Sequence, residues 1–256
     1  MPIRKQTLEE WFLCYQLKKL SQRHFHLPGS LDVDVTKIAN HYESKGLRPP
    51  YTAILIKAVA LAAQKNPQLN RMVFSTFWGT RIVEFENYTV NVPVIMEEDG
   101  KNYLSAITIK DANLLKISDI TSQIKKAKSR KLSETKVTKF VVGRNNILKR
   151  IILRVIHFLV FNFPNLYISK GGGGLSVSSL QNLEDEFLDM RFYPYGPTAI
   201  TFGLITVKKL PTKQTIMKIG AGYDHMACRA DQMTLGLRDL TKILSTPDLS
   251  LMDSLE

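Results

Sequence analysis

Apolar residues recur at helical spacing in several separate stretches of the chain. In residues 52–66 the apolar positions between 54 and 63 repeat with the period of a buried helix, and Pro67 ends the pattern. Thr7 precedes another such stretch as a helix N-cap, with Glu10 at the capping-box position. The spacing predicts helices at residues 7–21, 36–44, 52–66, 116–131 and 230–244.

Shorter stretches alternate between apolar and polar residues and are bounded by turn residues, which is typical of β-strands. Residues 24–35 contain Pro28-Gly29, so we expect a short first strand and then a second strand at 30–35. The turn Glu98-Asp99-Gly100 fits a hairpin. Further strands are predicted at residues 72–74, 80–84, 90–97, 103–109, 175–180, 199–207 and 213–223. Helices and strands alternate without an internal repeat or an obvious linker, which predicts a single α/β domain spanning residues 1–256.

Residues 151–168 are the most lipophilic part of the chain. The stretch contains Arg154, His157 and Pro164, and is shorter than the roughly 20 clean apolar residues that a membrane-spanning helix needs. Lys149 and Arg150 precede it, as in helices that lie on a membrane surface. Two interpretations follow, a helix buried in the core and a membrane-surface helix, and the buried helix is favoured.

The composition is that of an ordinary globular protein, with 44% apolar and 23% charged residues in 256. The formal charge is +12, and residues 101–150 hold 13 Lys or Arg against three acidic residues. Such a basic block is typical of a solvated helix face or of a surface that binds an anionic partner. Without an RNA-binding aromatic signature, zinc spacing or helix-turn-helix pattern, we expect no nucleic acid. Peripheral membrane contact stays open.

Two cysteines, Cys14 and Cys228, provide no disulfide framework and indicate a reducing compartment. Residues 1–10 are polar and charged, unlike a secretory signal. We therefore expect a cytoplasmic protein.

Two groups of residues suggest ligand chemistry at first sight. The run Gly171–Gly174 lacks the Lys-Ser/Thr and the helix start of a phosphate loop, and a strand follows it. His24 and His26 share one face of a strand, yet no nearby cysteine or acidic cluster completes a metal-ligand set. We expect a tight turn at the glycines, a structural role for the two histidines, and no metal.

His225 lies between a predicted strand and the last predicted helix. A histidine at a strand end that faces a cleft is a candidate general base, and a structural histidine is the alternative. The residues around it decide between these interpretations, because they form part of a longer ordered pattern.

That pattern resembles the catalytic domain of the acyltransferases of 2-oxoacid dehydrogenase complexes, and so chloramphenicol acetyltransferase. Residues 224–230 (DHMACRA) are similar to the family motif Asp-His-Arg-x-x-Asp-Gly, and residues 176–180 (SVSSL) to its Thr-x-Ser-Asn/Ser-Leu strand. Further segments resemble the family in collinear order: residues 33–36 (VDVT), 56–62 (IKAVALA), 66–70 (NPQLN), 90–94 (VNVPV) and the helix near 117–126. Together they cover roughly residues 30–245.

The resemblance implies an α/β, chloramphenicol acetyltransferase-like two-layer sandwich in which a mixed sheet packs with helices. It implies acyl transfer between a coenzyme A thioester and a thiol, amine or hydroxyl acceptor, with His225 as general base and Ser178 as oxyanion donor. It further implies a homotrimer with the active site between subunits. No lipoyl group is expected, so the partner would be acyl-CoA or an acyl-carrier protein. Residues 1–29 form an N-terminal helix and first strand, and residues 137–174 are a divergent insert.

The motif departs from the family at two positions. The family aspartate four residues after the histidine is Arg229 here, and the following glycine is Ala230. Replacing an anion by a cation reverses the local field, and Asp231 lies two residues further on. The alternative hypothesis is therefore a catalytically inactive member that acts as a trimeric scaffold or complex subunit. The direction of the Arg229 side chain distinguishes the two.

Overall fold

A six-stranded mixed sheet forms the centre of the protein. The computed structural model describes residues 5–22, 24–142, 145–169, 172–179, 192 and 198–248. The strands of the described residues are β1 (His26–Asp34), β2 (Arg71–Thr76), β3 (Gly79–Glu84), β4 (Val90–Glu98), β5 (Lys101–Ile109), β6 (Leu175–Ser179), β7 (Ile200–Lys209) and β8 (Thr215–Asp224). The main sheet has the order β1-β8-β7-β6-β4-β5, with β6 parallel to β7 and β4 and all other neighbours antiparallel. The β2–β3 hairpin is separate.

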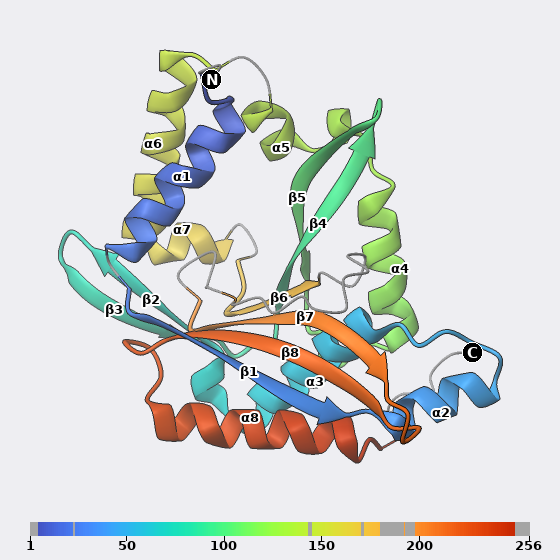
Figure 1. The fold of residues 1–256 in the computed structure, drawn as a ribbon. Helices are drawn as coiled ribbons and strands as arrows, with labels where there is room; N and C mark the ends of the chain where they lie inside the picture. Colours follow the sequence, from blue (N-terminus) through green and yellow to red (C-terminus); the bar gives the residue numbers. More distant parts are fainter. Residues whose placement is uncertain are drawn as a thin grey trace, which may run out of the picture.

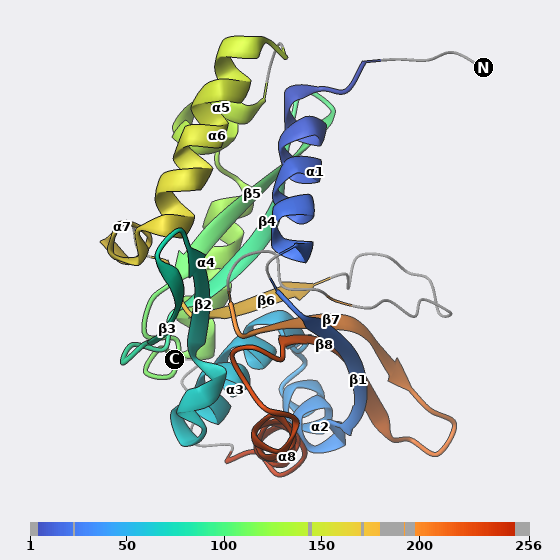
Figure 2. The same ribbon diagram turned by 90° about the vertical axis from the view of Figure 1, so that its left-hand side faces the viewer.

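Helices lie on both sides of this sheet (Figures 1 and 2). They are α1 (Leu8–Ser21), α2 (Thr36–Ser44), α3 (Tyr51–Lys65), α4 (Ile117–Lys128), α5 (Lys136–Val141), α6 (Ile147–Asn162), α7 (Pro164–Ser169) and α8 (Ala230–Ser245), with 3-10 turns at Pro67–Leu69 and Leu132–Glu134. Helices α2, α3 and α8 cover one face of β1, β8 and β7, whereas α1 and α6 stand together on the opposite side (Figure 2). This arrangement is the mixed α/β sandwich that the family resemblance implied.

The main core lies between the sheet and helix α3. This helix is apolar almost all round, and its side chains from Ala53 to Ala60 are buried. The exception is Lys57, which is 6% exposed. Its ammonium group donates hydrogen bonds of 2.7 Å to the carbonyl oxygens of Asn113 and Leu115, and burial lowers its pKa. The buried charge thereby fixes the loop that follows β5 to the core helix.

Helix α1 begins where the sequence predicts. The Thr7 hydroxyl accepts from the Glu10 amide at 3.1 Å, and the Glu10 carboxylate accepts from the Thr7 amide at 2.9 Å, which completes the predicted capping box. Helix α1 then packs against α6, with Arg154 stacked over the rings of Trp11 and Tyr15 at 5.5 and 5.7 Å. The two helices form one upper layer above the sheet.

Among the helices and strands predicted from periodicity, two differ from the structure by more than two residues. Residues 26–34 form one continuous strand instead of two, because Pro28 pairs with Gly222 in a strand at the edge of the sheet. A proline without an N–H is tolerated at such an edge, where no second neighbour needs the donor. The helix predicted to reach Lys131 ends at Lys128. The hairpin turn is confirmed, with positive φ at Asp99 and Gly100.

The glycine run before β6 is required by close packing. A Cβ at Gly173 would overlap the carbonyl oxygen of Thr89, and a Cβ at Gly174 would meet the side chain of Asn70. Neither glycine has the positive φ that would make a turn the reason for its presence. Gly171 lies outside the described residues. Small residues are needed here because the chain passes close to Asn70 and Thr89, the residues just before β2 and β4.

The expectation that residues 151–168 form a buried helix is wrong. They form most of α6 and α7, and α6 buries only one side, with Leu153, His157, Phe161 and Asn162. No helix among the described ranges is both long enough and apolar enough to cross a bilayer. The insert therefore adds a half-exposed layer to the fold.

Candidate functional site

A cavity of about 510 Å³ lies between helices α1 and α5 and the main sheet. Its roof comes from one face of α1, with Glu9, Phe12, Leu13 and Gln16 at helical spacing, and from α5. Its floor comes from β4, β5, β6 and β7. The volume falls within the range of small-molecule sites, and most of the lining is apolar.

Ser178 lies in the wall of this cavity. In β6 the side chains alternate, so Leu175 and Val177 enter the core beside α3 while Ser176 and Ser178 face the cavity. Asn91 and Thr201 from the neighbouring strands add further polar groups. The predicted oxyanion donor is thus a hydroxyl at the edge of a mainly apolar chamber.

His225 occupies the turn immediately after β8. Its backbone N–H donates to the Phe25 carbonyl oxygen at 2.8 Å, and its exposed ring lies 6.4 Å from the Phe25 ring and 6.0 Å from the Tyr223 ring. It is not among the described residues that line the cavity. The imidazole is therefore accessible to solvent.

Ser178 and His225 are not brought together within the chain. Ser178 pairs with Gly203 in β7, and Gly203 pairs with Gly220 in β8, so two strand spacings separate Ser178 from Gly220. His225 follows Gly220 by five residues. At about 4.8 Å per strand and about 3.3 Å per residue, the two Cα atoms are about 19 Å apart. One reacting carbonyl cannot contact both groups of the same chain.

A buried pair of side chains holds the turn that carries His225. His24 Nδ1 lies 2.6 Å from Asp224 Oδ2, and both side chains are almost inaccessible. The other oxygen of Asp224 accepts from the amides of Phe25 and Met226 at 3.2 and 3.0 Å. Burial by itself raises the pKa of Asp224, but the hydrogen bonds from His24 and the Met226 amide outweigh it and the net pKa is lowered. Sequence reasoning missed this pair, because a separation of 200 residues carries no local signal.

His26 completes a cluster of three residues of metal-ligating types, because the fold brings Asp224 to the two histidines although no acidic cluster lies near them in sequence. Ligand atoms of His24, His26 and Asp224 all lie within 4.8 Å of one another. The 2.6 Å between His24 Nδ1 and Asp224 Oδ2 is a hydrogen-bond distance, shorter than the roughly 3.3 Å between ligand atoms of a tetrahedral ion with bonds of about 2.0–2.1 Å, so the geometry is that of a hydrogen-bonded pair. The His26 ring stacks on His24 at 5.6 Å, and burial lowers its pKa. We therefore assign the cluster a bracing role.

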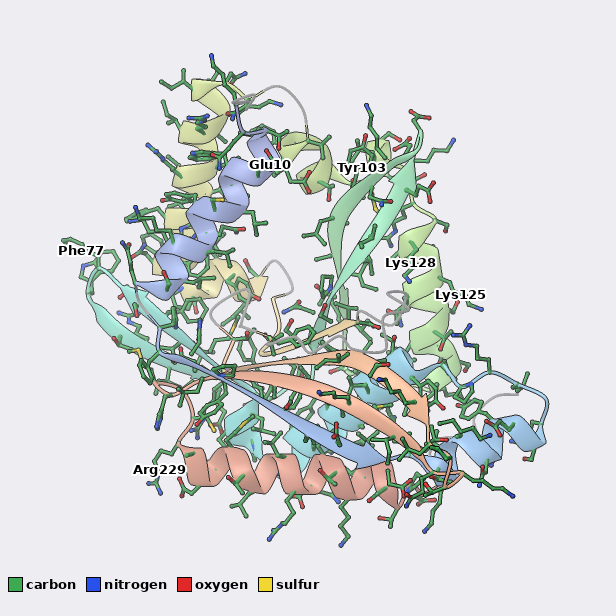
Figure 3. All side chains as sticks on the ribbon, viewed as in Figure 1. Glu10, Phe77, Tyr103, Lys125, Lys128 and Arg229 are labelled. Carbon is green, nitrogen blue, oxygen red and sulfur yellow. The ribbon has the colours of Figure 1, made fainter. Side chains whose placement is uncertain are left out.

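Arg229, the departure from the family motif, points into solvent. Its guanidinium forms two hydrogen bonds to the Asp231 carboxylate, at 3.0 and 2.6 Å, and both side chains are mostly exposed. Figure 3 shows Arg229 at the start of α8, remote from the upper layer. The cation is paired locally and does not enter the cavity lined by Ser178.

The fold is that of the acyltransferase cores of 2-oxoacid dehydrogenase complexes. A probable dihydrolipoamide acetyltransferase from Listeria monocytogenes superposes with a TM-score of 0.65 at 16% identity, over 100% of this chain and 96% of that one. A truncated catalytic core of the 2-oxoacid dehydrogenase multienzyme complex from Thermoplasma acidophilum has a TM-score of 0.67 at 16% identity, over 97% of this chain and 100% of that one.

Azotobacter vinelandii dihydrolipoamide acetyltransferase, studied for the role of a serine, a histidine and an asparagine in its catalytic mechanism, has a TM-score of 0.66. It is 12% identical over 98% of this chain and 93% of that one. No family profile matches the sequence, and no curated protein matches it either. At these identities the likeness establishes the fold.

Proposed function

We infer that this protein is an acyltransferase that moves an acyl group between coenzyme A and a thiol, amine or hydroxyl acceptor. The observation that carries the proposal is the position of the Ser178 hydroxyl at the wall of an apolar cavity within an acyltransferase fold. An apolar chamber beside an oxyanion donor suits an acyl chain, whose methylene groups gain free energy on leaving water.

His225 takes the acceptor proton as the acceptor attacks the thioester carbonyl carbon. The carbonyl oxygen becomes an oxyanion, and the Ser178 hydroxyl donates a hydrogen bond to it. Collapse of the tetrahedral species breaks the carbon–sulfur bond, and the imidazolium returns its proton to the departing coenzyme A thiolate. A general base must be neutral before it takes a proton, and both ring nitrogens of a neutral histidine can take part in such a transfer. Loss of one oxyanion donor typically lowers the rate about 10²–10³-fold.

The two groups act on the same carbonyl when His225 of one protomer meets Ser178 of another. The separation of about 19 Å within one chain supports this arrangement, because strand geometry keeps the two residues apart. The exposure of His225 supports it too, since a partner surface must reach the ring. A closed homotrimer would generate three such sites by symmetry.

The first experiment measures thiol release from a panel of acyl-CoA thioesters, from acetyl to long chain, with thiol, amine and alcohol acceptors. His225→Ala and Ser178→Ala should each abolish or strongly reduce release. His41→Ala on α2, across the sheet from the cavity, is the matched control and should retain activity. Unchanged release in both site variants would refute the mechanism.

Mixing the two inactive variants tests the shared site directly. If the variants are co-assembled in equal amounts, about a quarter of the sites combine an intact His225 with an intact Ser178, and activity should return to about that fraction. No recovery from verified mixed assemblies would refute a site built from two chains.

An inactive scaffold is the second candidate function, and Arg229 in place of the family aspartate is its motivation. The ion pair between Arg229 and Asp231 weakens the scaffold hypothesis, because it holds the guanidinium at the protein surface. Intact assemblies that neither bind coenzyme A nor release thiol from any thioester would favour the scaffold.

A further inference from the structure

The exposed side of α6 is almost entirely apolar. Eight of its side chains are at least 37% exposed: Ile147, Leu148, Ile151, Ile152, Val155, Ile156, Phe158 and Leu159. These residues form a continuous stripe on the side away from α1, and we call them the α6 apolar face. Soluble monomers rarely expose contiguous apolar surface of this extent unless it binds something.

The tip of the β2–β3 hairpin extends this face with two aromatic rings. Phe77 is 82% and Trp78 63% exposed. The Trp78 ring lies 5.7 Å from Phe163 at the end of α6, and the Phe77 amide donates to Asn162 Oδ1 at 2.8 Å. Figure 3 shows Phe77 at the outer edge of the molecule, beyond the hairpin. The hairpin tip is therefore fixed to α6 and presents its rings outward.

Every charged residue in the segment that carries this face is basic. Residues 135–183 contain seven Lys or Arg and no Asp or Glu. Lys149, Arg150 and Arg154 lie on α6 itself, and Arg154 is exposed while it stacks over the rings of Trp11 and Tyr15. Helix α4 contributes its own lysines, including Lys125 and Lys128, on another side of the protein (Figures 1 and 3). The basic block of the sequence thus divides into two separate surfaces.

We propose that the α6 apolar face and the hairpin tip dock onto an anionic lipid membrane. An apolar helix face flanked by Lys and Arg, with aromatic rings beside it, is the combination that binds at the headgroup boundary. A two-fold contact with a second copy would bring the same basic groups together, and that repulsion opposes it. The opposite side of α6 is buried against the protein, so the helix lies on the bilayer surface.

Vesicle flotation of the full-length protein tests the proposal. Mixed phosphatidylserine–phosphatidylcholine vesicles should carry the protein upward, and pure phosphatidylcholine vesicles should carry much less. The double variant Ile151→Gln, Val155→Gln keeps good helix formers and should weaken binding at least about tenfold. Leu114→Gln, which removes an even more exposed apolar side chain after β5, is its control and should bind like wild type.

A charge variant tests the same surface without touching the apolar residues. Lys149→Gln, Arg154→Gln should weaken binding to anionic vesicles about 25-fold, at about fivefold for each basic residue lost. Lys125→Gln, Lys128→Gln on α4 is the matched control and should change binding by less than about twofold.

Equal binding to neutral and anionic vesicles would overturn the proposal, as would equal effects of the α4 and α6 charge variants. Sedimentation velocity supplies the third readout. If wild type does not float and the Ile151→Gln, Val155→Gln variant instead reduces its oligomeric mass, the face joins copies of this chain and the membrane proposal is wrong.

Discussion

Asp224→Ala should destabilise the protein by about 4 kcal/mol. The side chain is fully buried and accepts from His24 and from the amides of Phe25 and Met226. Its removal leaves two amide donors unsatisfied, at about 1 kcal/mol each, and removes a charge-assisted bond of about 2 kcal/mol. The total is comparable to breaking a buried ion pair, and is a large share of a typical domain stability of about 5–15 kcal/mol.

Asp224→Asn is the discriminating variant. Its carbonyl oxygen can still accept from the Phe25 and Met226 amides, and its NH₂ group can donate to His24 in the other ring tautomer. We therefore expect a loss of only about 1 kcal/mol. Urea denaturation followed by circular dichroism measures both variants, with the m-value as a check that unfolding stays two-state. A loss below about 1 kcal/mol for Asp224→Ala, or equal losses for the two variants, would refute the bracing role.

Three further predictions concern the core, the pH dependence and the glycine run. Lys57→Met should cost about 2–4 kcal/mol in urea denaturation because two half-buried carbonyl groups lose the buried ammonium that donates to them, whereas exposed Lys65→Met on the same helix should cost less than about 0.5 kcal/mol. Burial lowers the pKa of His26 from 6.5, so the unfolded chain takes up this proton first as the pH falls. The free energy of unfolding should therefore fall as the pH drops below 6.5, and His26→Gln should flatten that dependence. An unaltered pH profile in the variant would contradict the burial of a neutral His26. Gly173→Ala should lower the melting temperature, with a loss of about 2 kcal/mol or more, since its Cβ meets the backbone of Thr89; an unshifted melt would show that β6 can move.

Local signals predicted much of the fold. The capping box at Thr7 and Glu10 and the turn at Asp99-Gly100 depend only on neighbours in sequence, and both formed as expected. The α6 prediction failed because apolar periodicity shows which side of a helix avoids water but not what covers it.

The candidate site also combines features that neighbouring residues predict with contacts between residues far apart in sequence. The placement of Ser178 on a strand followed from local pattern, while its cavity required α1, which folds back from the far end of the chain. The His24–Asp224 contact depends on the pairing of the first and last strands, β1 with β8. No short-range feature of the sequence reports that pairing.

The connection between α1 and β1 is short, so a movement of α1, which forms the cavity roof, is passed to the turn that carries His225. Helix α1 ends at Ser21, and by His24 and Phe25 the chain is already bonded to Asp224 and His225. Four or fewer residues cannot absorb a large displacement of the helix without moving one end or the other. A molecule that lifts α1 to enter the cavity must therefore strain the turn about 19 Å away from Ser178. The imidazole resonances of His225 would then report the filling of the chamber in its own chain, which this ring does not line.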